Sequence, residues 1–116
     1  MSEITLNTLE DGLYATAQLT PNALAALARG GIRSIINNRP DFEGGPEQAT
    51  SDQMQHAAEA AGLAYRYLPV NGAHQTPEEA AAFARLITEL PRPIVAYCRS
   101  GTRVSRLYQL GREQDS

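Results

Sequence analysis

Short apolar runs alternate along the chain with longer runs in which apolar residues return every three or four positions. The short runs are typical of buried strands, and the longer ones are typical of helices that bury one face. The predicted strands cover residues 3–9, 13–17, 32–36, 63–70 and 94–97, and the predicted helices cover residues 21–29, 51–61, 77–90 and 104–111. This alternation favours an α/β fold in which helices pack on a mainly parallel sheet.

Threonine residues mark the starts of three predicted helices. Thr20 and Thr76 each precede a proline, which suits the first helical position because no amide hydrogen is needed there. Thr50 and Thr76 are followed three residues later by Gln53 and Glu79, which completes the capping-box pattern of reciprocal side-chain-to-backbone hydrogen bonds. Local sequence therefore predicts where these helices begin.

Three polar loops follow predicted strands, at residues 37–41, 71–76 and 98–103. Ligands of parallel α/β sheets bind outside the carboxyl ends of the strands, so we expect these loops to meet at one edge of the sheet. The chemically active side chains that they place at this edge are Arg39, His74, Cys98, Arg99 and Arg103.

The loop from Tyr97 to Arg103 contains the only cysteine of the chain, between a predicted strand and a predicted helix. The exposed amides of a helix N-terminus favour negative charge, and Arg99 and Arg103 add positive charge nearby. Such surroundings favour the thiolate, which is the nucleophilic form of cysteine. We therefore predict a reactive Cys98 in an anion-binding cradle. The alternative is a buried structural cysteine at the end of a strand.

Composition narrows the classes of function. The 116 residues predict a single domain, 1–116, and the net charge of −3 disfavours binding to nucleic acid. No apolar run approaches the ~18 residues that span a membrane, and the N-terminus lacks the pattern of a secretory signal. One cysteine cannot form an internal disulfide, which fits a reducing cytoplasm. No residue cluster has metal-ligand spacing, so we expect neither a metal nor another cofactor.

Three blocks of the sequence resemble one protein family. They are Gln18–Pro21 (QLTP), Ile35–Asp41 (IINNRPD) and Tyr97–Arg103 (YCRSGTR). In their order and spacing they resemble the phosphatase-like domain of beta-lactamase-hydrolase-like proteins, over nearly the whole chain. The resemblance implies a three-layer cysteine-phosphatase-like (dual-specificity phosphatase) fold, with a mainly parallel central sheet of about four to five strands. It also implies sulfurtransferase activity in some members, often linked to a persulfide dioxygenase of metallo-β-lactamase fold, whereas other relatives have been regarded as phosphatases.

The spacing between Cys98 and Arg103 bears on the choice between these two chemistries. In cysteine phosphatases, which the loop resembles, the phosphate-binding arginine follows the cysteine by six positions. Here the sixth position is Val104 and the arginine is at the fifth. Rhodanese-type sulfurtransferases have this shorter loop, which suits one sulfur atom more readily than a phosphoryl group. Valine also has no hydroxyl to help a thiolate leave, so Ser100 and Thr102 are the remaining candidates to stabilise the thiolate.

A phosphatase also needs a proton donor for the leaving oxygen. Phosphatases of this kind supply an aspartate from a loop upstream of the cysteine, but the matching residues 70–75 contain no aspartate. His74 is a candidate, although a lone loop histidine is more often a solvated surface residue. Asp41 is another, although it is equally suited to form an Asx turn. A thiolate that only accepts and passes on sulfur needs neither residue, so these observations favour sulfur transfer.

The sequence therefore predicts a sulfurtransferase that moves sulfane sulfur from thiosulfate or a small persulfide through a persulfide on Cys98. Arg103 would stabilise the thiolate and the bound anion. Arg39 would either hold the anion from across the pocket or pair with Asp41 or Glu43. The alternatives are a cysteine-dependent phosphatase with the same nucleophile, and a binding module without turnover. The predicted anion-binding residues besides Arg103 are Arg39, Arg99, Ser100, Gly101 and Thr102.

Overall fold

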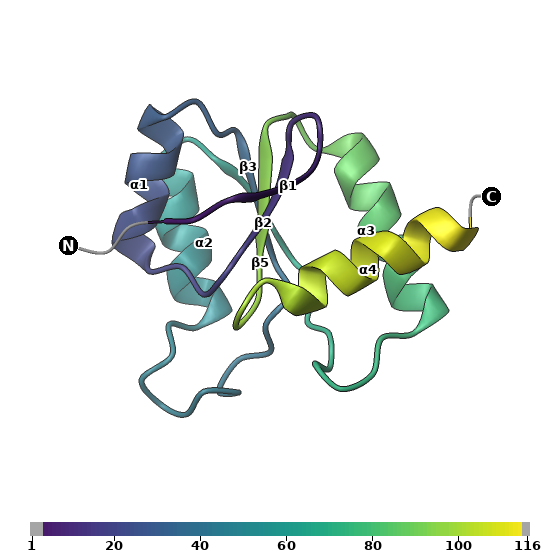
Figure 1. Ribbon diagram of the computed structural model, residues 1–116. Helices are drawn as coiled ribbons and strands as arrows, with labels where there is room; N and C mark the ends of the chain where they lie inside the picture. The colour runs from purple at the N-terminus through teal and green to yellow at the C-terminus, as the bar shows by residue number, and fades with distance from the viewer. Residues whose placement is uncertain (1–3, 115–116) are drawn as a thin grey trace.

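The computed structural model describes residues 4–114, and a five-stranded sheet lies at their centre (Figure 1). The strands are β1 (Asn7–Glu10), β2 (Leu13–Thr16), β3 (Ser34–Asn37), β4 (Ala64–Tyr67) and β5 (Ile94–Tyr97). Their order across the sheet is β1-β2-β5-β3-β4. Strand β1 pairs antiparallel with β2, and all other neighbours are parallel. The mainly parallel sheet is therefore confirmed.

Four helices within the described residues cover the two faces of the sheet. They are α1 (Pro21–Arg29), α2 (Ser51–Ala60), α3 (Pro77–Glu89) and α4 (Thr102–Gln114). Helices α1 and α2 lie together on one side of the sheet, and α3 and α4 lie together on the other (Figure 1). This three-layer α/β arrangement confirms the predicted fold class.

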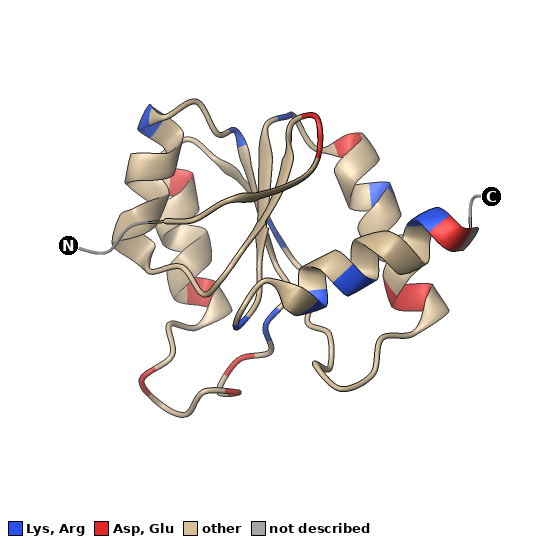
Figure 2. Cartoon of the chain, in the orientation of Figure 1, with Lys and Arg blue, Asp and Glu red and all other residues tan. Residues whose placement is uncertain are grey.

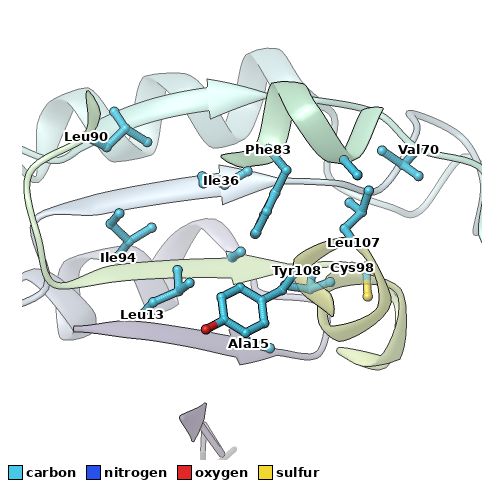
Figure 3. Packing of buried hydrophobic residues seen from close by; sticks show 13 residues of the cluster. Leu13, Ala15, Ile36, Val70, Phe83, Leu90, Ile94, Cys98, Leu107 and Tyr108 are labelled. Carbon is cyan, nitrogen blue, oxygen red and sulfur yellow. The ribbon is translucent and has the colours of Figure 1, made fainter. Parts of the chain in front are cut away.

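Each face of the sheet has its own hydrophobic core because successive strand residues point to opposite faces. Ile35 packs in the cluster under α1 and α2, whereas its neighbour Ile36 packs in the cluster under α3 and α4. Phe83 fills much of the second cluster (Figure 3). Cys98 belongs to the same cluster and lies just beyond the end of β5, so the predicted nucleophile is attached to a buried part of the core.

Four strands are shorter than the sequence predicts: β1 begins only at Asn7 and β2 ends at Thr16, and the shorter β3 and β4 have identifiable reasons. The backbone N–H of Ile32 donates to the carbonyl of Leu27, so residue 32 still closes helix α1 and β3 begins only at Ser34. Strand β4 ends at Tyr67 rather than at residue 70. Pro69 follows, and a proline has no N–H with which to continue a ladder. Residue 3 of the first predicted strand lies outside the described residues.

The predicted starts of α1, α2 and α3 are confirmed, whereas α4 begins at Thr102 and not at residue 104. The side chain of Thr20 accepts a hydrogen bond from the Ala23 amide. At α2 and α3 both halves of the capping box form. In α3, for example, Thr76 accepts from the Glu79 amide while the Glu79 carboxylate accepts from the Thr76 amide. These caps fix where each loop at the carboxyl edge of the sheet re-enters a helix.

Replacing Thr76 with alanine is expected to lower the free energy of unfolding by about 1 kcal/mol, because the Glu79 amide at the start of α3 loses the side-chain oxygen that accepts its hydrogen bond. Urea unfolding measures this difference. Thr88→Ala, on the same helix, is the matched control: its exposed hydroxyl only donates back to the Ala84 carbonyl, so we expect a change within about 0.5 kcal/mol. Equal losses in the two variants would contradict the capping role.

Candidate active site

Four parallel strands end in one row at the same edge of the sheet. Thr16 of β2 and Asn37 of β3 are both in register with Tyr97 of β5, and Tyr67 of β4 is in register with Asn37. The loops that leave these ends lie together at this edge (Figure 1). The three predicted loops do meet there, and the loop after β2 joins them. Basic positions from the loops and from the start of α4 gather at the same edge (Figure 2).

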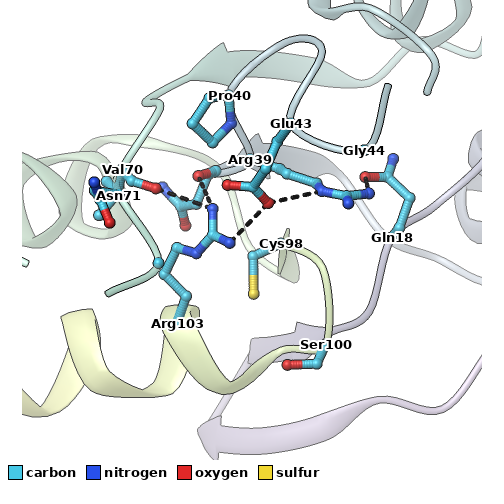
Figure 4. A network of polar contacts seen from close by, with 12 residues as sticks. Gln18, Arg39, Pro40, Glu43, Gly44, Val70, Asn71, Cys98, Ser100 and Arg103 are labelled. Atoms are coloured by element: carbon cyan, nitrogen blue, oxygen red, sulfur yellow. Dashed lines mark hydrogen bonds and ion pairs between the residues drawn. The ribbon is translucent and has the colours of Figure 1, made fainter. Parts of the chain in front are cut away.

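Cys98 is the first residue beyond β5 and is 1% exposed. Its sulfur points towards the turn that leads into α4 and accepts a hydrogen bond from the Gly101 amide at 3.1 Å (Figure 4). The turn requires glycine: Gly101 has a φ of +93°, and an added Cβ would lie 3.4 Å from the backbone of Thr16. A thiolate in this position would receive an amide hydrogen bond. Cys98 is thus both buried, as in the structural interpretation, and placed beside a donor that favours its anion.

The other polar groups of the Cys98 loop include the backbone amides of Arg99 and Ser100 and the hydroxyls of Ser100 and Thr102. Among the described residues, no group accepts a hydrogen bond from the backbone N–H of Arg99 or Ser100. The Ser100 hydroxyl donates to that of Thr102 at 3.2 Å and accepts from the Thr102 amide at 3.4 Å. The two hydroxyls therefore contact each other, and Cys98 Sγ has its hydrogen bond from the amide of Gly101 instead. Anion binding by this loop stays a prediction.

Arg103 is 8% exposed and is held from one side by backbone carbonyls. Its Nη1 donates to the carbonyl of Val70 at 2.9 Å and to that of Asn38 at 3.4 Å. Its Nη2 donates to the carboxylate of Glu43 at 2.9 Å, while its buried Nε has no hydrogen-bond partner among the described residues. Glycine at position 72 leaves the space, since a Cβ on Gly72 would lie 2.8 Å from Nη2.

The five-position spacing between cysteine and arginine follows from how α4 sits on the sheet. Helix α4 begins at Thr102, and successive helical residues point about 100° apart. Arg103 therefore faces the loops, while Val104 is fully buried in the cluster beneath α3 and α4. The valine at the sixth position is a core residue, and the arginine at the fifth is the one that reaches the site.

Glu43 bridges two arginines that are far apart in the sequence (Figure 4). One carboxylate oxygen accepts from Arg39 Nε at 3.0 Å and from Arg103 Nη2 at 2.9 Å. Arg39 also donates to the side-chain oxygen of Gln18 at 3.0 Å. Burial alone would raise the pKa of Glu43, but the hydrogen bonds and positive charges of Arg103 and Arg39 outweigh it and hold that pKa below its usual value. Glu43 is therefore an anion at neutral pH.

These residues surround a hollow of about 610 Å³. Three arginines and one glutamate line it, so its charge favours an anionic ligand. Exposed Arg99 is among the lining residues, in agreement with a role in drawing anions to the site. The lining residues are Arg39, Glu43, Gly44, Asn71, Gly72, Ala73, Arg99 and Arg103.

The two predicted proton donors lie elsewhere. Asp41 accepts a hydrogen bond from the Ser51 amide at 2.8 Å, which ties its loop to the start of α2. His74 is exposed, and its backbone N–H donates to the Asn71 carbonyl at 3.4 Å. Neither side chain lines the hollow, so their catalytic roles stay predictions. The acid that does line it is Glu43, which the sequence indicated only as a partner of Arg39.

Between residues 4 and 114, no helix has both the length and the apolar character needed to cross a membrane. Within the same range, no three His, Cys, Asp or Glu side chains are grouped as ligands of a metal ion.

Comparison with known sequences identifies a family. The model of the beta-lactamase hydrolase-like protein, phosphatase-like domain, matches residues 5–114. A beta-lactamase hydrolase-like protein of Xylella fastidiosa is 40% identical over 102 residues, which cover 88% of this chain and 23% of that protein. One of Agrobacterium fabrum is 41% identical over 90 residues, covering 78% of this chain and 21% of that protein. The chain thus spans less than a quarter of the length of these curated relatives.

Solved structures agree with this match. A candidate phosphatase from Neisseria meningitidis is 34% identical, with a TM-score of 0.85 over 94% of this chain and 77% of that one. The core catalytic domain of a PP-IP phosphatase from S. cerevisiae is 13% identical, with a TM-score of 0.63 over 83% of this chain and 56% of that one, a likeness of fold alone. The fold is therefore cysteine-phosphatase-like, as the sequence resemblance implied. The chain belongs to the family of phosphatase-like domains of beta-lactamase hydrolase-like proteins.

Proposed function

We propose that this chain is a cysteine-dependent hydrolase of phosphoric monoesters. The observation that carries the proposal is the oxyanion already held beside the Cys98 loop: the carboxylate of Glu43 lies 2.9 Å from Arg103 Nη2. A buried guanidinium that binds one oxyanion is suited to bind a phosphoryl group in the same place. The match to a phosphatase-like domain family and the likeness to the solved candidate phosphatase structure described above support this choice over sulfur transfer.

The proposed reaction has two steps. The Cys98 thiolate attacks phosphorus, an S–P bond forms, and the bond from phosphorus to the leaving oxygen breaks. Water then attacks the cysteinyl-phosphate, which releases inorganic phosphate and restores the thiolate. Arg103 and the free amides of the loop would stabilise the charge on the phosphoryl oxygens in both transition states. A leaving group that is stable as an anion, such as p-nitrophenolate, needs no proton donor.

Sulfur transfer is the second candidate, favoured by the spacing of five positions between Cys98 and Arg103 and by the buried valine that follows. In this reaction the thiolate takes the sulfane sulfur of thiosulfate, sulfite leaves, and the Cys98 persulfide passes its outer sulfur to a nucleophile such as cyanide. A small anionic sulfur donor and a persulfide dioxygenase partner of metallo-β-lactamase fold belong to this candidate. A single domain over residues 1–116 and a cytoplasmic location are part of both proposals.

One preparation of the protein distinguishes the two reactions. We expect hydrolysis of p-nitrophenyl phosphate that is inhibited by vanadate, and no transfer of sulfur from thiosulfate to cyanide. Intact mass spectrometry after incubation with thiosulfate should show no gain of one sulfur atom on the protein. Thiocyanate formation together with such a gain, in the absence of phosphate release, would overturn the proposal and establish the second candidate.

A further inference from the structure

The guanidinium of Arg103 has one anchored end and one open edge. Nη1 is fixed by the carbonyls of Val70 and Asn38. On a guanidinium, Nε–H and Nη2–H lie side by side and point the same way, and together they form the fork that binds two oxygens of one oxyanion. In Arg103, Nη2 donates to Glu43, while the neighbouring Nε is buried and has no hydrogen-bond partner between residues 4 and 114. Glu43 therefore uses only half of the fork.

The loop that carries Glu43 adopts a costly backbone conformation. Phe42, directly before it, has a φ of +66°, which is rare for a bulky residue. Phe42 is 65% exposed, so its own burial does not compensate for this conformation. Strain of this kind is typical of switch regions and ligand clamps. It accompanies a geometry in which the next residue, Glu43, turns back to the two arginines.

Glu43 is also the only side chain of the loop that forms a hydrogen bond with the Arg103 guanidinium in the described structure. Arg39 keeps a second partner, Gln18, when Glu43 leaves. The Glu43 side chain is 28% exposed, so it has a route to solvent. Its departure would free Nη2 beside the unpartnered Nε and leave both arginines at the hollow.

We propose that Glu43 is an internal occupant of the oxyanion site, and that a tetrahedral oxyanion displaces its carboxylate from Arg103 when it binds. The proposal rests on the proposed function only in naming this site as the place where the substrate's oxyanion sits. A dianion such as a phosphoryl group carries more charge than the carboxylate and can engage both Nε and Nη2. Because the two anions repel each other, the displaced Glu43 side chain moves towards solvent.

Glu43→Gln tests this by direct binding. At pH 7, isothermal titration calorimetry with inorganic phosphate, and separately with thiosulfate, should show about three- to tenfold tighter binding to the variant, because the site is no longer occupied by an internal anion for most of the time. Glu43→Ala should show the same gain, which controls for hydrogen bonds made by the new amide. In the wild-type protein, the Arg103 Nε–H resonance should shift when phosphate binds.

Glu47→Gln is the matched control. It removes the same charge from the same loop, at an exposed carboxylate that is no lining residue of the hollow, and should leave both affinities unchanged. Unchanged or weaker phosphate and thiosulfate binding by both Glu43 variants would overturn the proposal and make Glu43 a positioning residue for Arg103. If the Glu43 variants bound phosphate more tightly but the wild-type protein had no phosphatase activity, the proposed function would be refuted. The inference about Glu43 would still hold.

Discussion

Replacing Cys98 with serine is expected to reduce hydrolysis of p-nitrophenyl phosphate by on the order of 10³-fold or more, because a serine hydroxyl at this position has no base to activate it. The group that contacts Sγ is the Gly101 amide, which is a donor and stabilises an anion but cannot accept a proton. Steady-state release of p-nitrophenolate measures the loss. The same variant should lose any transfer of sulfur from thiosulfate to cyanide.

The serine variant also separates chemistry from binding. Arg103 and the free loop amides are unchanged in it, so phosphate should bind with an affinity close to that of the wild type. Because Cys98 is 1% exposed within a hydrophobic cluster, the unfolding midpoint must be measured as well. Retention of a tenth or more of the wild-type activity in a folded variant would show that Cys98 is a structural cysteine, and would refute both candidate reactions.

Replacing Arg103 with lysine is expected to lower kcat/KM for p-nitrophenyl phosphate by about 10²–10³-fold. Lysine keeps the positive charge but lacks the planar fork of two parallel N–H groups. It also cannot reach the Val70 and Asn38 carbonyls and the ligand in the same geometry. The loss should fall on both phosphate affinity and kcat, which initial-rate kinetics over a range of substrate concentrations would separate.

Arg106→Lys is the matched control for this variant. Arg106 lies on the same helix but is exposed and lines no part of the hollow, so kcat/KM should stay within about twofold of the wild type. Removing the Arg103 guanidinium also leaves carbonyls with one donor fewer, so some loss of stability is expected, about 1–3 kcal/mol. If the two lysine variants had equal activity, Arg103 would have only a structural role.

The Cys98 loop can be predicted from the sequence, whereas the pairing of Glu43 with Arg103 cannot. Within the loop, cysteine, glycine and arginine are close in sequence, and a strand end followed by a helix start largely fixes their relative positions. Glu43 and Arg103 are separated by 60 positions, and nothing in either segment indicates the pairing. It depends on a left-handed residue, Phe42, that sequence preferences would not place there.

The conformation of each loop also decides which of the predicted site residues line the hollow. Arg39 and His74 were both predicted at the carboxyl edge, since each follows a strand of the sheet. Arg39 lines the hollow, whereas His74 does not. The topology brings the loops together, but the turns within each loop decide which side chains point inward. The hydrogen bond from the Ser51 amide to Asp41 likewise depends on the conformation of the loop, because it joins residues ten positions apart rather than the two of an Asx turn.

Local sequence is enough to predict the α/β alternation, the capped starts of α1, α2 and α3 and the edge of the sheet at which the site lies. These features depend on short-range hydrogen bonds and on hydrophobic periodicity, which are determined by residues close together in the sequence. Three other features follow only from the folded chain: Glu43 occupies the Arg103 fork, Gly72 makes room for this guanidinium, and Val104 belongs to the core. Those features depend on the register of the strands and the paths of separate loops, and therefore on contacts between residues that are distant in the chain.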